Sequence, residues 1–149
     1  MSTDPVLGAG HTLHRIDLGS DDEGPLQASL IHREPVPGDA PRTGRTPPVL
    51  LMHGWSDYVF DRDLMDHLGV RGHDVWGLDL RKYGRSLRDG QTPGYIADLA
   101  IYDEDIAAAL DAMGRGEGGV ESDRRLILLG HSTGGLTLSL WASRHPGAA

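Results

Sequence analysis

Short, largely apolar runs alternate with helix-like stretches along this chain, and that alternation limits the folds open to it. The runs are Val49–Met52, Asp74–Leu80 and Arg125–Leu129. They are short enough for strands, and the first has no polar residue that would mark a face in water. We therefore expect them to be strands of a mainly parallel sheet, covered by helices on both faces.

Three stretches with helical periodicity follow these strands in turn. The first, residues 58–70, repeats its apolar positions every four residues from Phe60. The second, residues 95–113, has apolar residues three or four apart, so that its acidic run Asp103–Asp105 is expected to face solvent. The third, residues 134–145, is apolar almost all round, which is typical of a central helix.

Two stretches with looser alternation precede the first apolar run. They are His11–Leu18 and Leu26–Arg33, separated by an acidic turn, and they indicate an antiparallel strand pair. The order is then β-β followed by β-α-β-α-β-α. This pattern predicts the α/β class, with an antiparallel pair leading into a mainly parallel sheet whose crossovers are right-handed.

Composition excludes several classes of function. The 149 residues carry 22 acidic and 14 basic side chains, a net charge of -8 that disfavours nucleic acid and anionic lipid surfaces as partners. No apolar stretch approaches the roughly 20 residues that span a bilayer, and the first residues do not resemble a secretory signal. With no cysteine present, we expect a cytoplasmic protein. No metal-ligand spacing or dinucleotide motif appears, so neither a metal nor a cofactor is expected.

The segment Gly130-His131-Ser132-Thr133-Gly134 fits the pattern G-x-S-x-G between a predicted strand and a predicted helix. In that setting the serine occupies a strained turn, and the glycines two residues before and after it leave room for the turn. A helix that begins at Thr133 would direct its free N–H groups at a developing oxyanion. The alternative is a serine that only caps a helix after a glycine turn.

A second motif, His53-Gly54-Trp55, follows the first apolar strand directly. It lies at the carboxyl edge of the predicted sheet, where open α/β sheets bind ligands. Together with this motif, "GHDVWGLDLRKYGRS", "YIADLAIYDEDIAAAL" and "LILLGHSTGG" stand in the order seen in α/β-hydrolases. The chain resembles the N-terminal half of that fold, nearest the lysophospholipase and monoacylglycerol lipase-like branch, also termed serine aminopeptidase-like.

The resemblance implies roles for individual residues. Ser132 would be the nucleophile, and the backbone N–H groups of Trp55 and Thr133 would form the oxyanion hole. His53 and Gly54 would shape the loop that carries the first of these groups. His131 precedes the nucleophile, but neighbouring strand residues point to opposite sides, so a buried packing role is expected for it rather than that of a base. Relatives usually carry glycine at the position of Lys82, so the turn there is expected to differ.

The same resemblance implies a catalytic acid and then a histidine after the serine. Only 17 residues follow Ser132, and none is Asp or Glu. The one later histidine, His145, would lie roughly 18 Å away at the far end of the helix. We therefore expect residues 1–149 to be a single incomplete α/β-hydrolase domain, without its lid region and last strands, that derives from a truncated sequence and is inactive alone.

Three interpretations of function remain open at this stage. The first is a serine hydrolase that acts on small-molecule carboxylic esters. The second is a short, non-catalytic protein that binds a partner chain through the edge of the strand at 125–129 and the apolar helix at 134–145. The third, dehalogenation, is disfavoured because a serine stands where dehalogenases carry an aspartate. The sequence does not indicate the ester or the oligomeric state.

Overall fold

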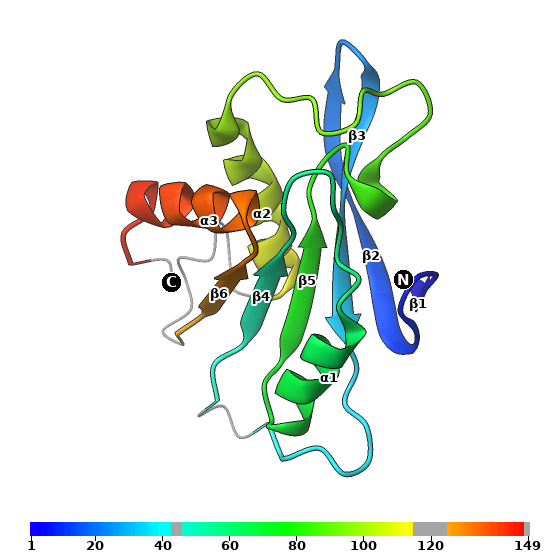
Figure 1. Ribbon diagram of the computed structural model, residues 1–149, viewed down its shortest axis with the longest axis vertical. Coiled ribbons are helices and arrows are strands. Elements are labelled where there is room, and N and C mark those ends of the chain that lie inside the picture. The colour runs from blue at the N-terminus through cyan, green and yellow to red at the C-terminus, as the bar shows by residue number, and fades with distance from the viewer. Residues whose placement is uncertain (43–45, 115–124, 148–149) are drawn as a thin grey trace.

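A single mixed sheet organises the computed structural model, which describes residues 1–42, 46–114 and 125–147. Within these residues, six strands stand in the order β1-β2-β3-β5-β4-β6, with α-helices packed against the sheet (Figure 1). The strands are β1 (Ser2–Asp4), β2 (Gly8–Asp21), β3 (Gly24–Arg33), β4 (Val49–Met52), β5 (Val75–Asp79) and β6 (Ile127–Gly130). The helices are α1 (Arg62–Val70), α2 (Tyr102–Ala112) and α3 (Thr133–Arg144). The predicted α/β class is confirmed.

The sheet changes from antiparallel to parallel at β5. Strands β2 and β3 form the expected antiparallel pair, and β3 also pairs with β5 in antiparallel fashion. Strand β4 is parallel to β5 on one side and to β6 on the other, with Val49 opposite both Val75 and Ile127. The connection after β4 leads to β5 on one side, and the connection after β5 passes back over β4 to β6 on the other side. The carboxyl end of β4 is therefore a topological switch point.

The two faces of β4 bury alternate residues in two separate cores. Leu50 and Met52 pack in one core with side chains of α2 and α3, including Ile106 and Trp141. Val49 and Leu51 pack in the other core with Met65 of α1. Right-handed crossovers that run in opposite directions along a sheet place their helices on opposite faces, which explains this division. The helices on both faces therefore hold β4 at the centre of the parallel region.

Helices α1 and α2 begin later than their apolar patterns predict. Helix α1 starts at Arg62, because the Asp61 side chain accepts a hydrogen bond from the Leu64 N–H at 3.0 Å and caps the helix. Phe60 consequently lies outside the helix and is 57% exposed, so its expected place in the apolar stripe is wrong. Helix α2 starts at Tyr102 rather than at residue 95, after a 3₁₀ turn over Leu99–Ile101.

Burial differs from the sequence expectation at three places. Asp105 was expected in solvent but is buried, where it accepts hydrogen bonds from the Arg81 N–H and Nε, each at 2.7 Å. Helix α3 buries only one face, and its Leu136 is half exposed, so it is not a central helix. The third apolar run is regular only over Ile127–Gly130, and Ile127 is 38% exposed because β6 is an edge strand in the described sheet.

Candidate active site

Two chain segments meet at the carboxyl ends of β4 and β6. Met52 and Gly130 are paired in register, and the His131 N–H donates to the Met52 carbonyl at 3.0 Å. This pairing places the segment that begins at His53 beside the turn that contains Ser132. The two sequence motifs, far apart along the chain, therefore share one edge of the sheet.

Ser132 occupies a backbone conformation that is rare for residues other than glycine. Its φ is 52° and its ψ is -122°, and it is the N-cap residue of α3. The Gly134 N–H donates to the His131 carbonyl at 2.9 Å, which closes the turn around the serine. Ser132 is exposed, and no described side chain is hydrogen-bonded to its hydroxyl. Such strain persists only where the surrounding structure fixes it, and it is common at functional sites.

Glycines make this turn sterically possible. A Cβ on Gly130 would lie 2.4 Å from the Gly135 nitrogen, and a Cβ on Gly134 would lie 2.3 Å from the His53 carbonyl oxygen. Gly54, in the loop after β4, packs closely against the same turn, because a Cβ there would be 3.2 Å from the Ser132 Cβ. The turn after β6 and the loop after β4 therefore pack backbone against backbone.

His53 is part of the framework of the site. It is buried, its Nε2 accepts a hydrogen bond from the Leu80 N–H at 3.1 Å, and its Nδ1–H donates to the Gly54 carbonyl at 2.8 Å. Burial lowers the pKa of His53 below its ordinary value of 6.5, which favours the neutral ring that these two bonds require. Because the lone pair of Nε2 is already engaged, His53 is not available as a base for Ser132.

Two backbone N–H groups belong to the segments that meet at the exposed serine: Thr133 follows it in the chain, and Trp55 follows Gly54, which packs against it. Neither the Trp55 N–H nor the Thr133 N–H donates to an acceptor among the described residues. Thr133 is the first residue of α3, where the helix dipole places partial positive charge. The Trp55 ring is 65% exposed, and its centroid lies 6.3 Å from that of Tyr83 in an edge arrangement. The two free donors are groups that can bind a developing oxyanion.

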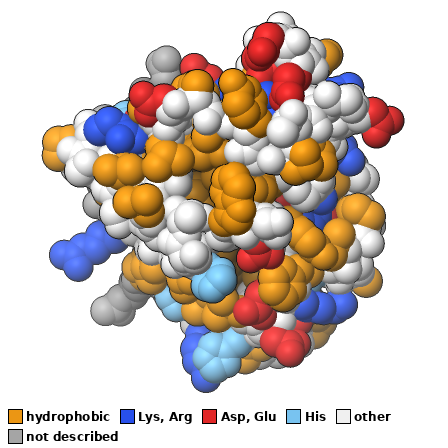
Figure 2. Space-filling model, turned by 45° about the horizontal axis from the view of Figure 1, so that its top comes forward, with side chains coloured by type: hydrophobic (Ala, Val, Ile, Leu, Met, Phe, Trp, Pro, Cys, Tyr) orange, Lys and Arg blue, Asp and Glu red, His pale blue; other side chains and the backbone are white. Residues whose placement is uncertain are grey.

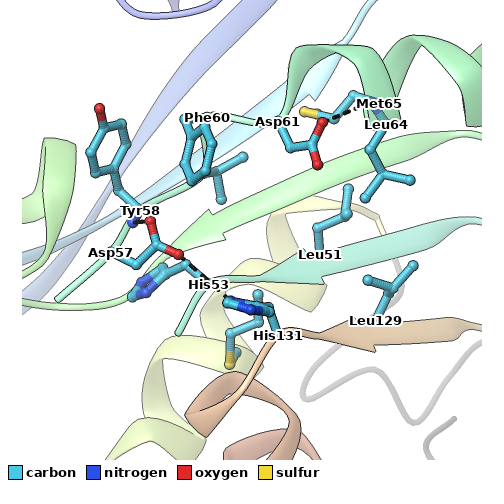
Figure 3. A pocket seen from close by; sticks show the side chains of 12 residues that line it. Leu51, His53, Asp57, Tyr58, Phe60, Asp61, Leu64, Met65, Leu129 and His131 are labelled. Atoms are coloured by element: carbon cyan, nitrogen blue, oxygen red, sulfur yellow. Dashed lines mark hydrogen bonds and ion pairs between the residues drawn. The ribbon is translucent and has the colours of Figure 1, made fainter. Parts of the chain in front are cut away.

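The sequence predicts a buried packing role for His131, and the structure contradicts this prediction. Its side chain is 79% exposed, and its Nδ1 lies 3.8 Å from a carboxylate oxygen of Asp57 (Figure 3). Gly130 faces α3, so the next residue points to the opposite face of the sheet. There β6 is the edge strand among those described, and helix α1 packs on the neighbouring strands instead.

Two hollows flank the serine turn. One, of about 210 Å³, has an apolar floor that includes Leu51, Leu64 and Leu129, with His131 and Asp57 at its rim (Figure 3). The other, of about 70 Å³, lies among Trp55, Thr133, Leu136 and nearby aromatic residues. Apolar side chains gather on this face of the molecule (Figure 2). Exposed members near the two hollows are Trp55, Tyr58, Phe60 and Leu136.

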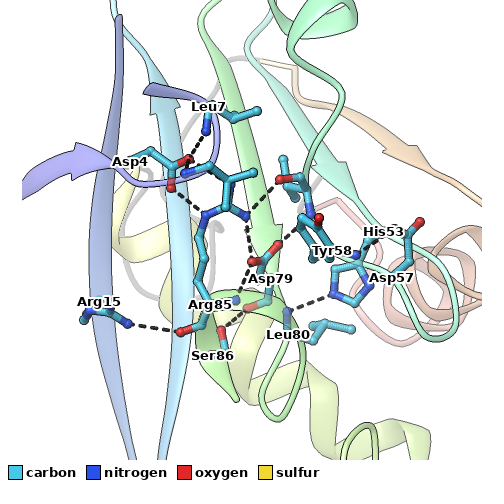
Figure 4. A network of polar contacts seen from close by, with 12 residues as sticks. Asp4, Leu7, Arg15, His53, Asp57, Tyr58, Asp79, Leu80, Arg85 and Ser86 are labelled. Carbon is cyan, nitrogen blue, oxygen red and sulfur yellow. Dashed lines mark hydrogen bonds and ion pairs between the residues drawn. The ribbon is translucent and has the colours of Figure 1, made fainter. Parts of the chain in front are cut away.

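A buried ionic network, not anticipated from the sequence, supports the loop after β4. Asp79, at the end of β5, accepts from the Val59 N–H at 2.7 Å and pairs with Arg85 at 2.8 Å (Figure 4). Arg85 also pairs with Asp4 near the N-terminus. The only sequence signal was a charged residue at a strand end in "DLRKYGRS".

His145 lies away from the serine turn. His145 follows α3, with its Nδ1 2.9 Å from the Trp141 carbonyl, at the opposite end of the helix from Ser132. In the described ranges, no group of three or more His, Asp or Glu side chains is arranged to hold a metal ion. No helix there is long and apolar enough to cross a membrane.

The strand order, the crossovers and the strand-serine turn-helix unit define an α/β-hydrolase fold. The family described as serine aminopeptidase, S33, matches residues 45–149, and the chain belongs to this family.

Individual relatives support the same fold. Over 100 residues the chain is 32% identical to a non-heme haloperoxidase of Rhodococcus erythropolis, a match that covers 66% of this chain and 32% of the relative. A probable hydrolytic enzyme of Pseudomonas aeruginosa PAO1 superposes with a TM-score of 0.67 at 20% identity, over 97% of this chain and 42% of that one. A bacterial membrane phospholipase A superposes at 0.55 and 26% identity, over 93% and 37%. The chain thus spans well under half the length of these proteins.

Proposed function

We propose that residues 1–149 form the nucleophile-bearing part of a serine hydrolase that cleaves carboxylic esters, in the manner of lysophospholipases and monoacylglycerol lipases. One observation carries the proposal: Ser132 is exposed in a strained turn at the N-terminus of α3, and the two segments that meet there carry the unengaged N–H groups of Trp55 and Thr133. A serine that only caps a helix would be expected to bond an N–H of the first turn, and the Ser132 side chain makes no such bond.

In the proposed reaction, the Ser132 hydroxyl attacks the ester carbonyl while a base removes its proton. The N–H groups of Trp55 and Thr133 stabilise the oxyanion of the tetrahedral intermediate. Collapse of the intermediate expels the alcohol, which takes up the proton, and leaves an acyl-serine. Water then attacks the acyl-serine with the help of the same base and releases the carboxylic acid.

The base and its orienting acid are proposed to come from outside these 149 residues. His53 is engaged in two backbone hydrogen bonds, and His145 lies at the far end of α3. In this fold the acid and the histidine follow the serine along the chain. The chain spans 32% of its curated relative, which supports residues 1–149 as part of one larger hydrolase domain.

A neutral ester with an apolar acyl group is the favoured substrate. The surroundings of the two N–H groups are apolar, with Trp55, Leu136 and Leu99 around the smaller hollow. Asp57 and Asp61 line the larger hollow, no described Lys or Arg lies in its wall, and the net charge of the chain is -8. Both features disfavour an anionic substrate group close to the serine.

The test is covalent labelling of the 149-residue chain with a fluorophosphonate, followed by intact mass. Without its base, Ser132 is expected to react slowly, and added imidazole should accelerate labelling by supplying a base. Ser132→Ala should abolish the mass shift. Ser139→Ala, on an exposed turn of the same helix, is the matched control and should label like the unaltered chain. Labelling that survives Ser132→Ala, or a folded chain that stays unlabelled with imidazole, would refute the proposal.

A second candidate is a non-catalytic role in binding a partner chain. It is favoured by β6, an edge strand with backbone groups unpaired on the side away from β4 among the described strands, and by the exposed Ile127. Labelling distinguishes the two functions, because a pure binding role requires no reactive serine.

A further inference from the structure

Backbone strain marks one residue that the proposed mechanism does not use. Among the described residues, positive φ angles outside glycine occur only at Ser56, Lys82 and Ser132. Two of these lie in the segments that form the site. The third, Lys82, has a φ of 61° in the turn after β5. A side chain retained in this conformation has to be held by its surroundings.

Buried ion pairs hold the Lys82 side chain. Its side chain is 1% exposed, and its Nζ lies 2.5 Å from a carboxylate oxygen of Asp21 and 2.6 Å from one of Glu23. Although burial opposes the charge, these bonds keep the pKa of Lys82 above its ordinary value of 10.5. Asp21 and Glu23 flank the tip of the β2–β3 hairpin.

The same hairpin tip also binds the segment that follows Lys82. Glu23 accepts a hydrogen bond from the Thr92 hydroxyl at 2.6 Å, and the Lys82 Nζ lies 5.2 Å from the centre of the Tyr95 ring. The Gly94 N–H donates to the Lys82 carbonyl at 2.9 Å. Lys82 therefore contacts both the hairpin tip and residues 92–95, which are also joined directly by the bonds between Thr92 and Glu23.

The residue after Lys82 connects this junction to the site. The ring centroid of Tyr83 lies 4.7 Å from that of His53 and 6.3 Å from that of Trp55. A Cβ on Gly94 would be 2.7 Å from the Tyr83 hydroxyl oxygen, so Tyr83 is enclosed on that side. Displacement of the turn at Lys82 would move Tyr83 against both residues of the loop after β4.

We propose that Lys82 is a positioning residue: by fixing the β2–β3 hairpin tip to the turn after β5, it holds Tyr83 against His53 and Trp55 and so sets the position of the Trp55 N–H. The functional part of this inference rests on the proposed function, since that N–H is assigned to the oxyanion hole. Lys82 itself touches no reacting atom.

Three variants separate charge from backbone strain. Lys82→Met keeps a long side chain and removes the charge. Lys82→Gly removes the charge and relieves the positive φ, so it should fold even where Lys82→Met is unstable. Lys82→Arg keeps the charge, so its labelling rate and hydrogen exchange should match those of the unaltered chain in part or in full.

Two readouts test the proposal on the 149-residue chain. The first is the dependence of Ser132 labelling on fluorophosphonate concentration in imidazole. Lys82→Met and Lys82→Gly should lower the maximal rate of Ser132 labelling by at least roughly tenfold, because a small misplacement of a catalytic group slows the reaction strongly. The fluorophosphonate concentration that gives half of the maximal rate should change little. The second is amide hydrogen exchange over residues 53–57, which should become faster in both variants. In Lys82→Arg the exchange rate should be close to that of the unaltered chain.

The outcomes separate this inference from the proposed function. Unchanged labelling and exchange in Lys82→Gly would overturn the positioning role, even if the variant melts at a lower temperature. If the unaltered chain shows no Ser132 labelling, the proposed function fails. Hydrogen exchange over residues 53–57 still decides whether Lys82 positions the loop in that case: faster exchange supports the role, and unchanged exchange overturns it.

Discussion

The loop after β4 and the turn after β6 face each other across the candidate site, but different forces hold them. Side-chain bonds hold the loop: His53 binds two backbone groups, and Asp79 binds the Val59 N–H with Arg85 beside it. Steric fit holds the turn, because Gly130 and Gly134 pack on backbone atoms. One half of the site therefore depends on buried polar groups, and the other depends on the absence of side chains.

Removal of Asp79 should have the largest effect. Asp79→Ala leaves Arg85 buried with one fewer partner and removes the acceptor for the Val59 N–H, so the free energy of unfolding should fall by about 3–5 kcal/mol. Urea denaturation measures this change. Asp89→Ala, at an exposed position in the neighbouring loop, should change it by no more than about 0.5 kcal/mol. Equal effects of the two substitutions would show that the loop does not depend on the network.

Gly134→Ala should cause the next largest loss of stability. Its Cβ would lie 2.3 Å from the His53 carbonyl oxygen, which is backbone and cannot move alone, so we expect a loss of about 3 kcal/mol. Gly135→Ala is the control, because the Cβ there meets only the Gly130 carbonyl group, at 3.4 Å from its oxygen and 3.8 Å from its carbon. Alanine in a helix should then stabilise α3 by about 0.5–1 kcal/mol. Thermal melts of the two variants should shift in opposite directions.

The pH dependence of stability should identify the contribution of His53. The pKa of His53 is lowered from 6.5 in the folded chain, so at pH 5 to 6.5 the unfolded chain binds more protons than the folded one. The stability from neutral His53 is present above pH 6.5 and is lost as the pH falls, by up to about 1.4 kcal/mol per pH unit. His53→Gln should flatten this part of the curve. Parallel curves for the two proteins would contradict the neutral, buried assignment.

Relief of strain at the serine should have the smallest effect, with the opposite sign. Ser132→Gly removes the cost of a φ of 52° with a ψ of -122°, so the free energy of unfolding should rise by about 1 kcal/mol. Ser139→Gly, in the interior of α3, should lower it by about 0.5 kcal/mol. A loss of stability in Ser132→Gly comparable to that in Ser139→Gly would mean that the turn is not strained.

The parts of the fold that were predicted from sequence depend on local patterns. The apolar runs locate β4, β5 and β6, and the glycines around Ser132 predict a tight turn between strand and helix. The parts that were missed depend on long-range partners. Arg85 pairs with Asp4 across most of the described chain, and Asp105 is buried because Arg81 reaches it from the end of β5.

His131 shows the same limit within the site. Alternation along a strand correctly places it on the side away from α3, but burial depends on what covers that side. Helix α1 packs over β4 and β5, and the ring at the end of β6 is exposed. Local sequence carries no information about coverage by a distant element, so the direction of the side chain was predictable and its exposure was not.

The strand order also determines when this molecule acquires its serine turn during synthesis. Strands β2 and β3 are neighbours in sequence and can pair as soon as they leave the ribosome, whereas β6 pairs with β4 across α1, β5 and α2. Contacts between residues so far apart form late, because a long loop has to close first. The nascent chain therefore carries most of the described strands before Ser132 is forced into its strained conformation.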